Sequence, residues 1–118
     1  MKKAQTPPNE QSRLHALYQI NILDTLPEKA FDDVAQLAAS ICEAPIALVT
    51  FVGSERQWFK ANIGLDFNET SRSISFCTHA ILEPDDVFVV PDALADGRFA
   101  TNPLVTNAPH IRFYAGAP

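Results

Sequence analysis

Apolar residues recur at helical spacing near the start of the chain. Residues 1–8 are polar and end in two prolines, which favours a flexible lead-in. Asn9 then stands where a helix cap is needed, and Leu14, Leu17 and Tyr18 follow at a spacing that places them on one side of a helix. The pattern therefore predicts a lead-in followed by an amphipathic helix.

A second helix is predicted over residues 27–42. Thr25 and Glu28 have the spacing of a capping box, and Pro27 lies in the first turn, where its missing N–H costs nothing. The following apolar residues fall on one face of this helix, which makes it amphipathic. They are Phe31, Val34, Leu37, Ala38 and Ile41.

In the middle of the chain the hydrophobic pattern changes from that of helices to that of two strands joined by a turn. Residues 46–52 are apolar and β-branched, which predicts a strand buried on both faces. A turn then leads to a polar and aromatic strand over 56–62, whose polarity predicts an edge position guarded by Lys60. Residues 64–73 are polar and predict a loop.

The last third contains short elements separated by prolines and capping residues. We expect a short helix over 75–82, a buried strand over 87–90, two one-turn helices within 92–105 and a last strand over 111–116. The order helix, helix, hairpin, helix, strand, loop, strand predicts an α+β fold with an antiparallel sheet, N-terminal helices on one face and a pocket of loops and a short helix on the other.

Charge and composition exclude several functions. The net charge of −5 and the pI of about 5.0 argue against nucleic-acid binding, which needs a basic surface. They also give no reason to expect an anionic membrane surface as a partner. The longest apolar run, 44–52, is half of a membrane span at best. With two cysteines and no export signal, we expect a cytoplasmic protein.

Several segments, in this order, resemble the GAF domains of bacterial signalling proteins. They are NILDTLPEKAFDDVAQLAA, PIALVTFVGSERQWFKANIGL, SFCTHAIL, VVPDALADGRF and NPLVTNAPHIRFYAGAP. The resemblance covers residues 9–118 and implies one sensory domain. It further implies a regulatory module that senses a small molecule or interacts with a protein and relays the signal through its terminal helices. The implied partners are a second copy in a homodimer and an output domain such as a histidine kinase or a diguanylate cyclase, as in two-component systems.

The resemblance also implies a C-terminally incomplete domain. Similar domains continue with a further strand and a closing helix, and that strand lies between the strands that correspond here to 46–52 and 111–117. Buried backbone groups without partners cost about 1–3 kcal/mol each. We therefore expect the gap to be closed by direct pairing of these two strands, or by a second copy of the chain, unless the chain is only part of a domain.

The resemblance places a ligand pocket beneath the short helix and the loop over 92–109. Arg98 and Arg112 fall in segments that line the pocket in the family, and either could bind an anion. We predict no catalytic residue, no metal and no cofactor. The predicted ligand-binding residues are Phe76, Cys77, His79, Arg98, Arg112 and Tyr114.

Cys77 leaves alternatives open. Bilin-binding relatives attach a chromophore through a cysteine followed directly by histidine, but Thr78 intervenes here, and a packed thiol is the preferred interpretation. A metal site would have only Cys77, His79 and His110, fewer than the four ligands of structural zinc. A thiol enzyme of the free methionine sulfoxide reductase type would use Cys77 as its reactive thiol, with Cys42 as its partner.

The cyclic-nucleotide-binding pattern of other GAF domains is absent from the sequence, and the four glycines form no phosphate-binding loop.

Overall fold

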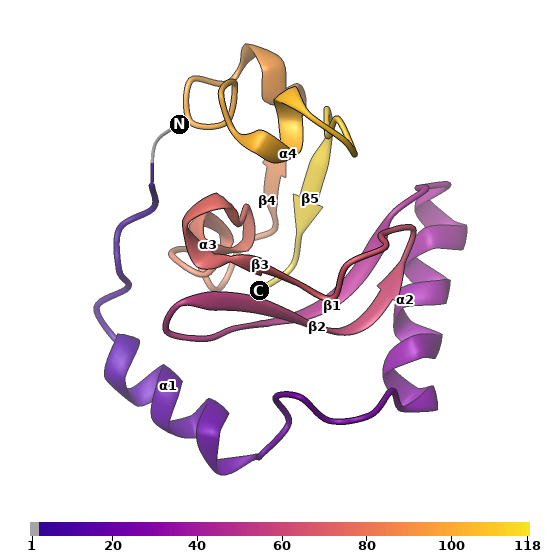
Figure 1. Cartoon of the computed structure of the whole chain (residues 1–118). Helices are drawn as coiled ribbons and strands as arrows, with labels where there is room; N and C mark the ends of the chain where they lie inside the picture. The colour runs from indigo at the N-terminus through magenta and orange to yellow at the C-terminus, as the bar shows by residue number, and fades with distance from the viewer. Residues whose placement is uncertain (1–2) are drawn as a thin grey trace. The chain divides into compact units, whose positions relative to one another are not determined.

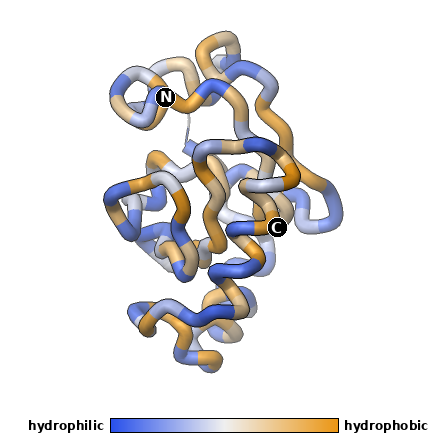
Figure 2. The backbone as a smooth tube through the Cα atoms, turned by 90° about the vertical axis from the view of Figure 1, so that its right-hand side faces the viewer, coloured by the Kyte–Doolittle hydropathy of each residue, from blue (hydrophilic) through white to orange (hydrophobic). Residues whose placement is uncertain are grey.

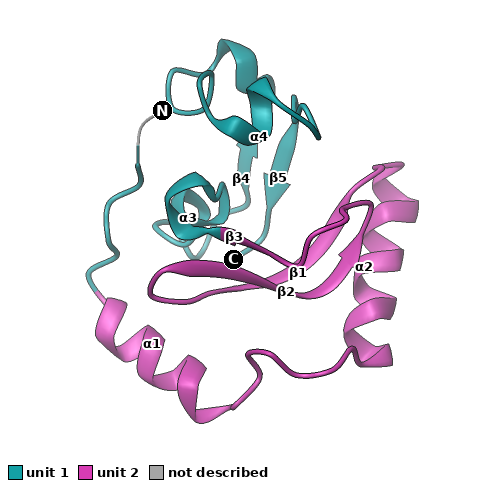
Figure 3. Ribbon diagram, in the orientation of Figure 1, with its two compact units in different colours: residues 1–8, 71–118 teal, residues 9–70 magenta. Residues whose placement is uncertain are grey.

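The computed structural model describes residues 3–118, so the first two residues of the predicted lead-in lie outside the described residues. The chain divides into two compact units (Figure 3). Unit 2 comprises residues 9–70, and unit 1 comprises residues 71–118 together with 1–8. Residues 3–7 contain no helix or strand, although Pro7 is buried.

Unit 2 contains two helices and the main part of a three-stranded sheet with strand order β1-β2-β3 (Figure 1). Its elements are α1 (Glu10–Gln19), α2 (Lys29–Cys42), β1 (Ala47–Val52), β2 (Arg56–Ile63) and β3 (Glu69–Ser71). Strands β1 and β2 are antiparallel, as the hairpin pattern predicts. The predicted polar loop contributes β3, so β2 is the central strand and the predicted edge position of β2 is wrong.

The pairing of β1 with β2 is interrupted by a bulge. Val49 pairs with Ala61 whereas the next residue, Thr50, pairs with Phe59, so Lys60 is the extra residue of the bulge. A bulge redirects the side chain that it contains. The Lys60 side chain is 0% exposed, so it does not guard an exposed edge.

Helix α2 packs against β1 and β2 (Figure 1). Its buried position is Ala35, and the small size of this side chain allows a close approach of helix and sheet. Most of the predicted apolar stripe of α2 faces away from the sheet. Val34, Leu37 and Ile41 are exposed in the described chain. The sequence thus predicts the helix but not the face that it buries.

The predicted helix caps also differ from the structure. Asn9 precedes α1 but makes no side-chain cap hydrogen bond. Thr25 and Glu28 do not form a capping box, because α2 begins at Lys29 and its N-cap residue, Glu28, makes no cap bond. The Thr25 hydroxyl instead donates to the carbonyl of Ile22 and accepts from Lys60.

Unit 1 is built from short elements around an apolar core. They are the 3-10 helices η1 (Arg72–Ile74) and η2 (Ala93–Ala95), the helices α3 (Cys77–Ala80) and α4 (Pro103–Thr106), and the strands β4 (Phe88–Val90) and β5 (Tyr114–Gly116). Strands β4 and β5 form an antiparallel pair. Five buried residues make up the core: Phe76, Val90, Ala93, Phe99 and Val105.

The buried side chain of Asn102 fixes the start of α4 in unit 1. Its amide oxygen accepts from Leu104 N, and its amide nitrogen donates to the carbonyl of Ile74. Both halves of the amide are therefore satisfied, as burial requires. This is the cap that the sequence pattern predicts at this position.

The two sheets confirm the predicted α+β fold class. The direct pairing of 46–52 with 111–117 is wrong, because β1 and β5 belong to different sheets within residues 3–118. The predicted helix over 75–82 is shorter than expected, with α3 limited to Cys77–Ala80.

Apolar and polar residues alternate over short distances along the chain (Figure 2). No helix within the described residues is both long enough and apolar enough to cross a membrane.

Candidate functional site

Five of the six predicted ligand-binding residues gather in unit 1 around a set of aromatic rings. The Phe76 ring stacks on Phe99 with 4.2 Å between centroids and 5° between planes. The centroid of the Tyr114 ring lies 5.1 Å from that of Phe76. The His79 ring meets Phe99 edge-on at 4.8 Å. We call these residues, with Cys77, Phe88, Asp96 and Arg98, the aromatic cluster.

Tyr114 is held in the aromatic cluster from two sides. Its hydroxyl lies 3.1 Å from Cys77 Sγ, a hydrogen bond in which either atom can be the donor. Its ring also lies over Gly116, where an added Cβ would be 2.2 Å from the tyrosine hydroxyl oxygen. A side chain at Gly116 would therefore displace Tyr114. Burial, together with the neighbouring Cys77, raises the pKa of Tyr114, so its hydroxyl stays protonated.

Arg98 is the cation of the aromatic cluster. Asp96 accepts from its Nε at 3.0 Å and from its Nη2 at 2.7 Å. Its guanidinium lies 5.1 Å from the ring centroid of Phe88 and 5.3 Å from that of Phe99. These bonds from Arg98 hold the pKa of Asp96 below its usual value, and Asp96 in turn raises the pKa of Arg98. The pair is therefore fixed and ionised.

Arg112, the sixth predicted residue, makes a different set of contacts. It is exposed, and its Nη1 donates to the carbonyls of Val105 and Ile111. The structure gives it a role in bracing the loop before β5. The sequence-based prediction did not name Phe88, Asp96 or Phe99 as site residues. Asp96 had a usable signal, because an acid two residues before an arginine can bind it across a turn.

The structure also bears on the alternatives for Cys77. Within residues 3–118, no group of three or more His, Cys, Asp or Glu side chains is placed to hold a metal ion. Cys77, His79 and His110 therefore do not form such a group. Cys42 is exposed at the end of α2 in unit 2, whereas Cys77 is half-buried in unit 1, and neither forms a disulfide.

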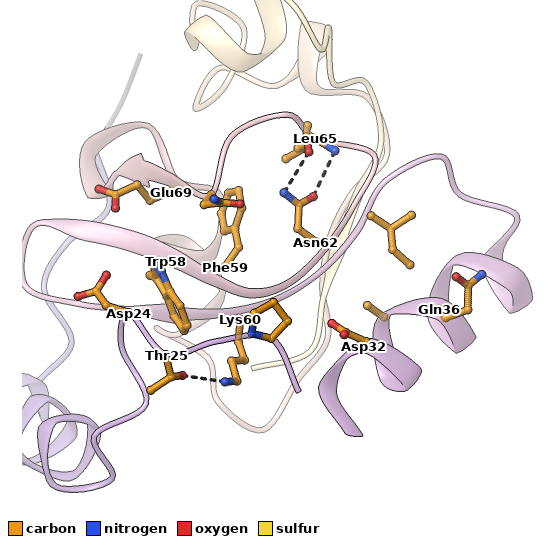
Figure 4. A pocket seen from close by; sticks show the side chains of 14 residues that line it. Asp24, Thr25, Asp32, Gln36, Trp58, Phe59, Lys60, Asn62, Leu65 and Glu69 are labelled. Carbon is orange, nitrogen blue, oxygen red and sulfur yellow. Dashed lines mark hydrogen bonds between the residues drawn. The ribbon is translucent and has the colours of Figure 1, made fainter. Parts of the chain in front are cut away.

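The cavity described in the structure lies in unit 2, and none of the predicted site residues is among those that line it (Figure 4). It measures about 810 Å³ and lies among α2, β2, the segment before α2 and the loop after β2. The Trp58 indole and the side chains of Asp24, Thr25 and Lys60 are among its walls. No sequence motif that we identified points to it.

The polar groups around this cavity largely bind one another. Asn62 binds the loop after β2 by donating to the carbonyls of Leu65 and Phe67 and accepting from Leu65 N. Arg56 Nη1 and Nη2 donate to the two carboxylate oxygens of Asp24 at 2.8 and 2.7 Å. This pairing lowers the pKa of Asp24 and raises that of Arg56. The lining therefore stabilises the unit internally.

Comparison with known proteins decides the family. The GAF domain family matches residues 26–118, most of the chain. The chain belongs to the GAF domain family. The match includes α2, both sheets and the whole aromatic cluster.

A curated relative of this GAF domain is a cyclic di-GMP phosphodiesterase of Pseudomonas aeruginosa. The two are 45% identical over 112 residues, which cover 95% of this chain and 19% of the relative. The chain thus spans about a fifth of the length of the relative that it matches.

As a GAF domain, the chain is a ligand-sensing regulatory module related to a signalling protein. The comparisons give no support to the thiol enzyme.

Proposed function

We propose that this GAF domain senses a small molecule at the aromatic cluster of unit 1 and regulates an output domain. The observation that carries the proposal is the convergence of Cys77, His79, Arg98 and Tyr114 on one set of rings. These side chains come from separate segments of unit 1, so a ligand that binds them contacts several segments at once.

The chemistry of the aromatic cluster suggests the class of ligand. The Arg98 side chain is 42% exposed, and its position is set by Asp96 and the rings beneath it. A fixed guanidinium beside aromatic rings suits a planar molecule that carries a carboxylate, phosphate or carbonyl oxygen. The half-buried Tyr114 hydroxyl, hydrogen-bonded to the Cys77 thiol, offers a further polar contact.

The relative supports a proposal for the output. Because it is a cyclic di-GMP phosphodiesterase, we propose an output enzyme of cyclic di-GMP signalling, either a phosphodiesterase of this kind or a diguanylate cyclase. A histidine kinase of a two-component system is the alternative output. In each case we propose a cytoplasmic homodimer, with the terminal helices carrying the signal.

Native mass spectrometry of the chain, expressed in bacterial cytosol, tests the proposed function. It reports bound mass and copy number together. We expect a dimer that carries a small non-covalent adduct. The adduct should be lost in Arg98→Gln and weakened in Tyr114→Phe. Arg112→Gln is the matched control, because within residues 3–118 the side chain of this arginine donates to loop carbonyls, and the variant should retain the adduct.

Each result has a defined meaning. An adduct retained at full occupancy in Arg98→Gln places the ligand elsewhere and refutes the proposed site. A protein that carries no adduct, and gains none from cyclic di-GMP, GMP or benzoate as added probes, contradicts small-molecule sensing at this site. A monomer contradicts the proposed homodimer but leaves the proposed ligand site untouched.

A further inference from the structure

Lys60 is a buried cation in unit 2, outside the aromatic cluster. It is the extra residue of the β2 bulge, and its side chain is 0% exposed. A lysine is almost never fully buried unless its charge is paired. Burial of this charge therefore requires partners, and the segment between α1 and α2 supplies them. We call this segment, residues 20–28, the connector.

The Lys60 ammonium makes one contact for each of its three N–H groups. Nζ donates to Thr25 Oγ1 at 2.7 Å and to the carbonyl of Leu26, and it pairs with Glu28 Oε2 at 2.7 Å. All three acceptors belong to the connector. The charge also lies 5.6 Å from the ring centroid of Phe31, at the start of α2. The described contacts of the Lys60 ammonium are therefore with the connector and with the start of α2.

A second cation, Arg56, also binds the connector. Arg56, four residues earlier on β2, holds Asp24 through two hydrogen bonds and also reaches Glu69 at 3.0 Å. The connector itself bends sharply, with positive φ angles at Asn21 and Asp24. Asn and Asp tolerate this backbone region better than most residues. A bent segment without regular structure is thus held to the sheet by two side chains.

We propose that Lys60 is a buried latch that closes the connector over β2, so that the connector opens locally when the latch is released. The connector and Trp58 line the same cavity (Figure 4). Release of the latch therefore opens one wall of this cavity and exposes the indole, which is only 7% exposed when the latch is closed. This proposal concerns unit 2 alone and does not depend on ligand binding at the aromatic cluster.

Residue-resolved hydrogen exchange of the full chain tests the latch. Lys60→Met keeps the length of the side chain and removes its charge. The reporters are the amides that bond connector carbonyls: Thr25 to Ile22, and Phe31 and Asp32 to Glu28. In Lys60→Met these amides should exchange about 10- to 100-fold faster, because hydrogen bonds to a charged group are lost. The β1–β2 ladder should change much less.

The matched control is Lys29→Met. Lys29 also pairs with a carboxylate, that of Asp33, but the Lys29 side chain is 87% exposed. Lys29→Met should leave the exchange rates of the reporter amides unchanged. Trp58 is the chain's single tryptophan, so acrylamide quenching of its fluorescence gives a second readout. Quenching should increase in Lys60→Met and not in Lys29→Met.

A milder variant covers the case in which Lys60→Met does not fold. Glu28→Gln removes one charge from a side chain that is 60% exposed, and it should accelerate the same amides by a smaller factor. Unchanged connector exchange in the folded variants overturns the latch. Equal acceleration of the connector and the β1–β2 ladder also overturns it, because Lys60 would then stabilise the whole sheet without controlling a local opening.

Discussion

The two units of this GAF domain are stabilised by different interactions. The core of unit 1 is a group of apolar residues that includes the stacked rings of Phe76 and Phe99. The central strand of unit 2 instead buries Gln57 and Lys60 beside Trp58 and Phe59. Unit 1 therefore depends on packing and should be sensitive to lost volume. Unit 2 depends partly on buried polar contacts and should be sensitive to lost partners.

The largest expected effect is the loss of a ring from unit 1. Phe99 is 1% exposed, and Phe99→Ala should lower the free energy of unfolding by about 3–5 kcal/mol, because it removes buried area and leaves a cavity. Urea denaturation measures the loss. Phe113→Ala is the control, since Phe113 is 63% exposed, and it should change stability by at most about 0.5 kcal/mol. Equal effects of the two variants would contradict a packed core in unit 1.

A smaller effect, of opposite sign, is expected at the end of α2 in unit 2. Glu43 caps this helix in the left-handed conformation, with φ 51° and ψ 42°. Its negative charge also lies at the negative end of the helix dipole. Glu43→Gly should therefore raise stability by about 1 kcal/mol, measured by thermal unfolding.

Glu43→Ala separates the two causes at this position. Alanine removes the charge but keeps the disfavoured backbone conformation. It should recover only the smaller, electrostatic part of the gain. If alanine and glycine stabilise equally, the backbone conformation is not the reason.

The smallest expected effect is a difference between the two units in how their stability responds to acid. The pKa values of Asp24 in unit 2 and Asp96 in unit 1 are lowered from 3.8, in each case mainly by the hydrogen bonds of a partner arginine. Their stabilising contributions are thus fully present well above pH 3.8 and are lost as the pH falls through the lower, folded-state values. Asp24→Asn and Asp96→Asn should each flatten the loss of stability in acid.

The two aspartates should differ in the size of this effect. The Asp96 side chain is 18% exposed and that of Asp24 is 64% exposed, so solvent screens the Asp24 pair more strongly. Asp96→Asn should therefore have the larger effect when urea denaturation is followed at pH 6, 4 and 3. Asp66→Asn, at an exposed loop position outside both pairs, is the control. A larger effect at Asp24 would contradict this ranking.

The sequence predicted most elements, and it named residues that the structure brings together in unit 1. Proline and capping residues marked the short elements of unit 1, and five of the six predicted site residues do meet in the aromatic cluster. Arg112 instead donates to backbone carbonyls, and such contacts carry no sequence signal. The strand β3 was missed because a three-residue strand in a polar segment has no period to detect.

Lys60 shows where local sequence is insufficient. A lysine in a polar strand predicts an exposed edge, and Thr25 with Glu28 predicts a capping box. In the structure Thr25 and Glu28 both bind Lys60, although they lie more than thirty residues before it. Each pattern was interpreted within its own element, whereas the contact joins two elements.

What the sequence determined by itself is the order and type of the elements, because helix and strand periods, caps and prolines act over a few neighbouring residues. Only the tertiary structure decided which face of α2 is buried, that β2 is central, and that Lys60 is enclosed by the connector. These outcomes depend on the partners that each surface meets, and small residues such as Ala35 allow a close contact that hydrophobicity alone does not predict.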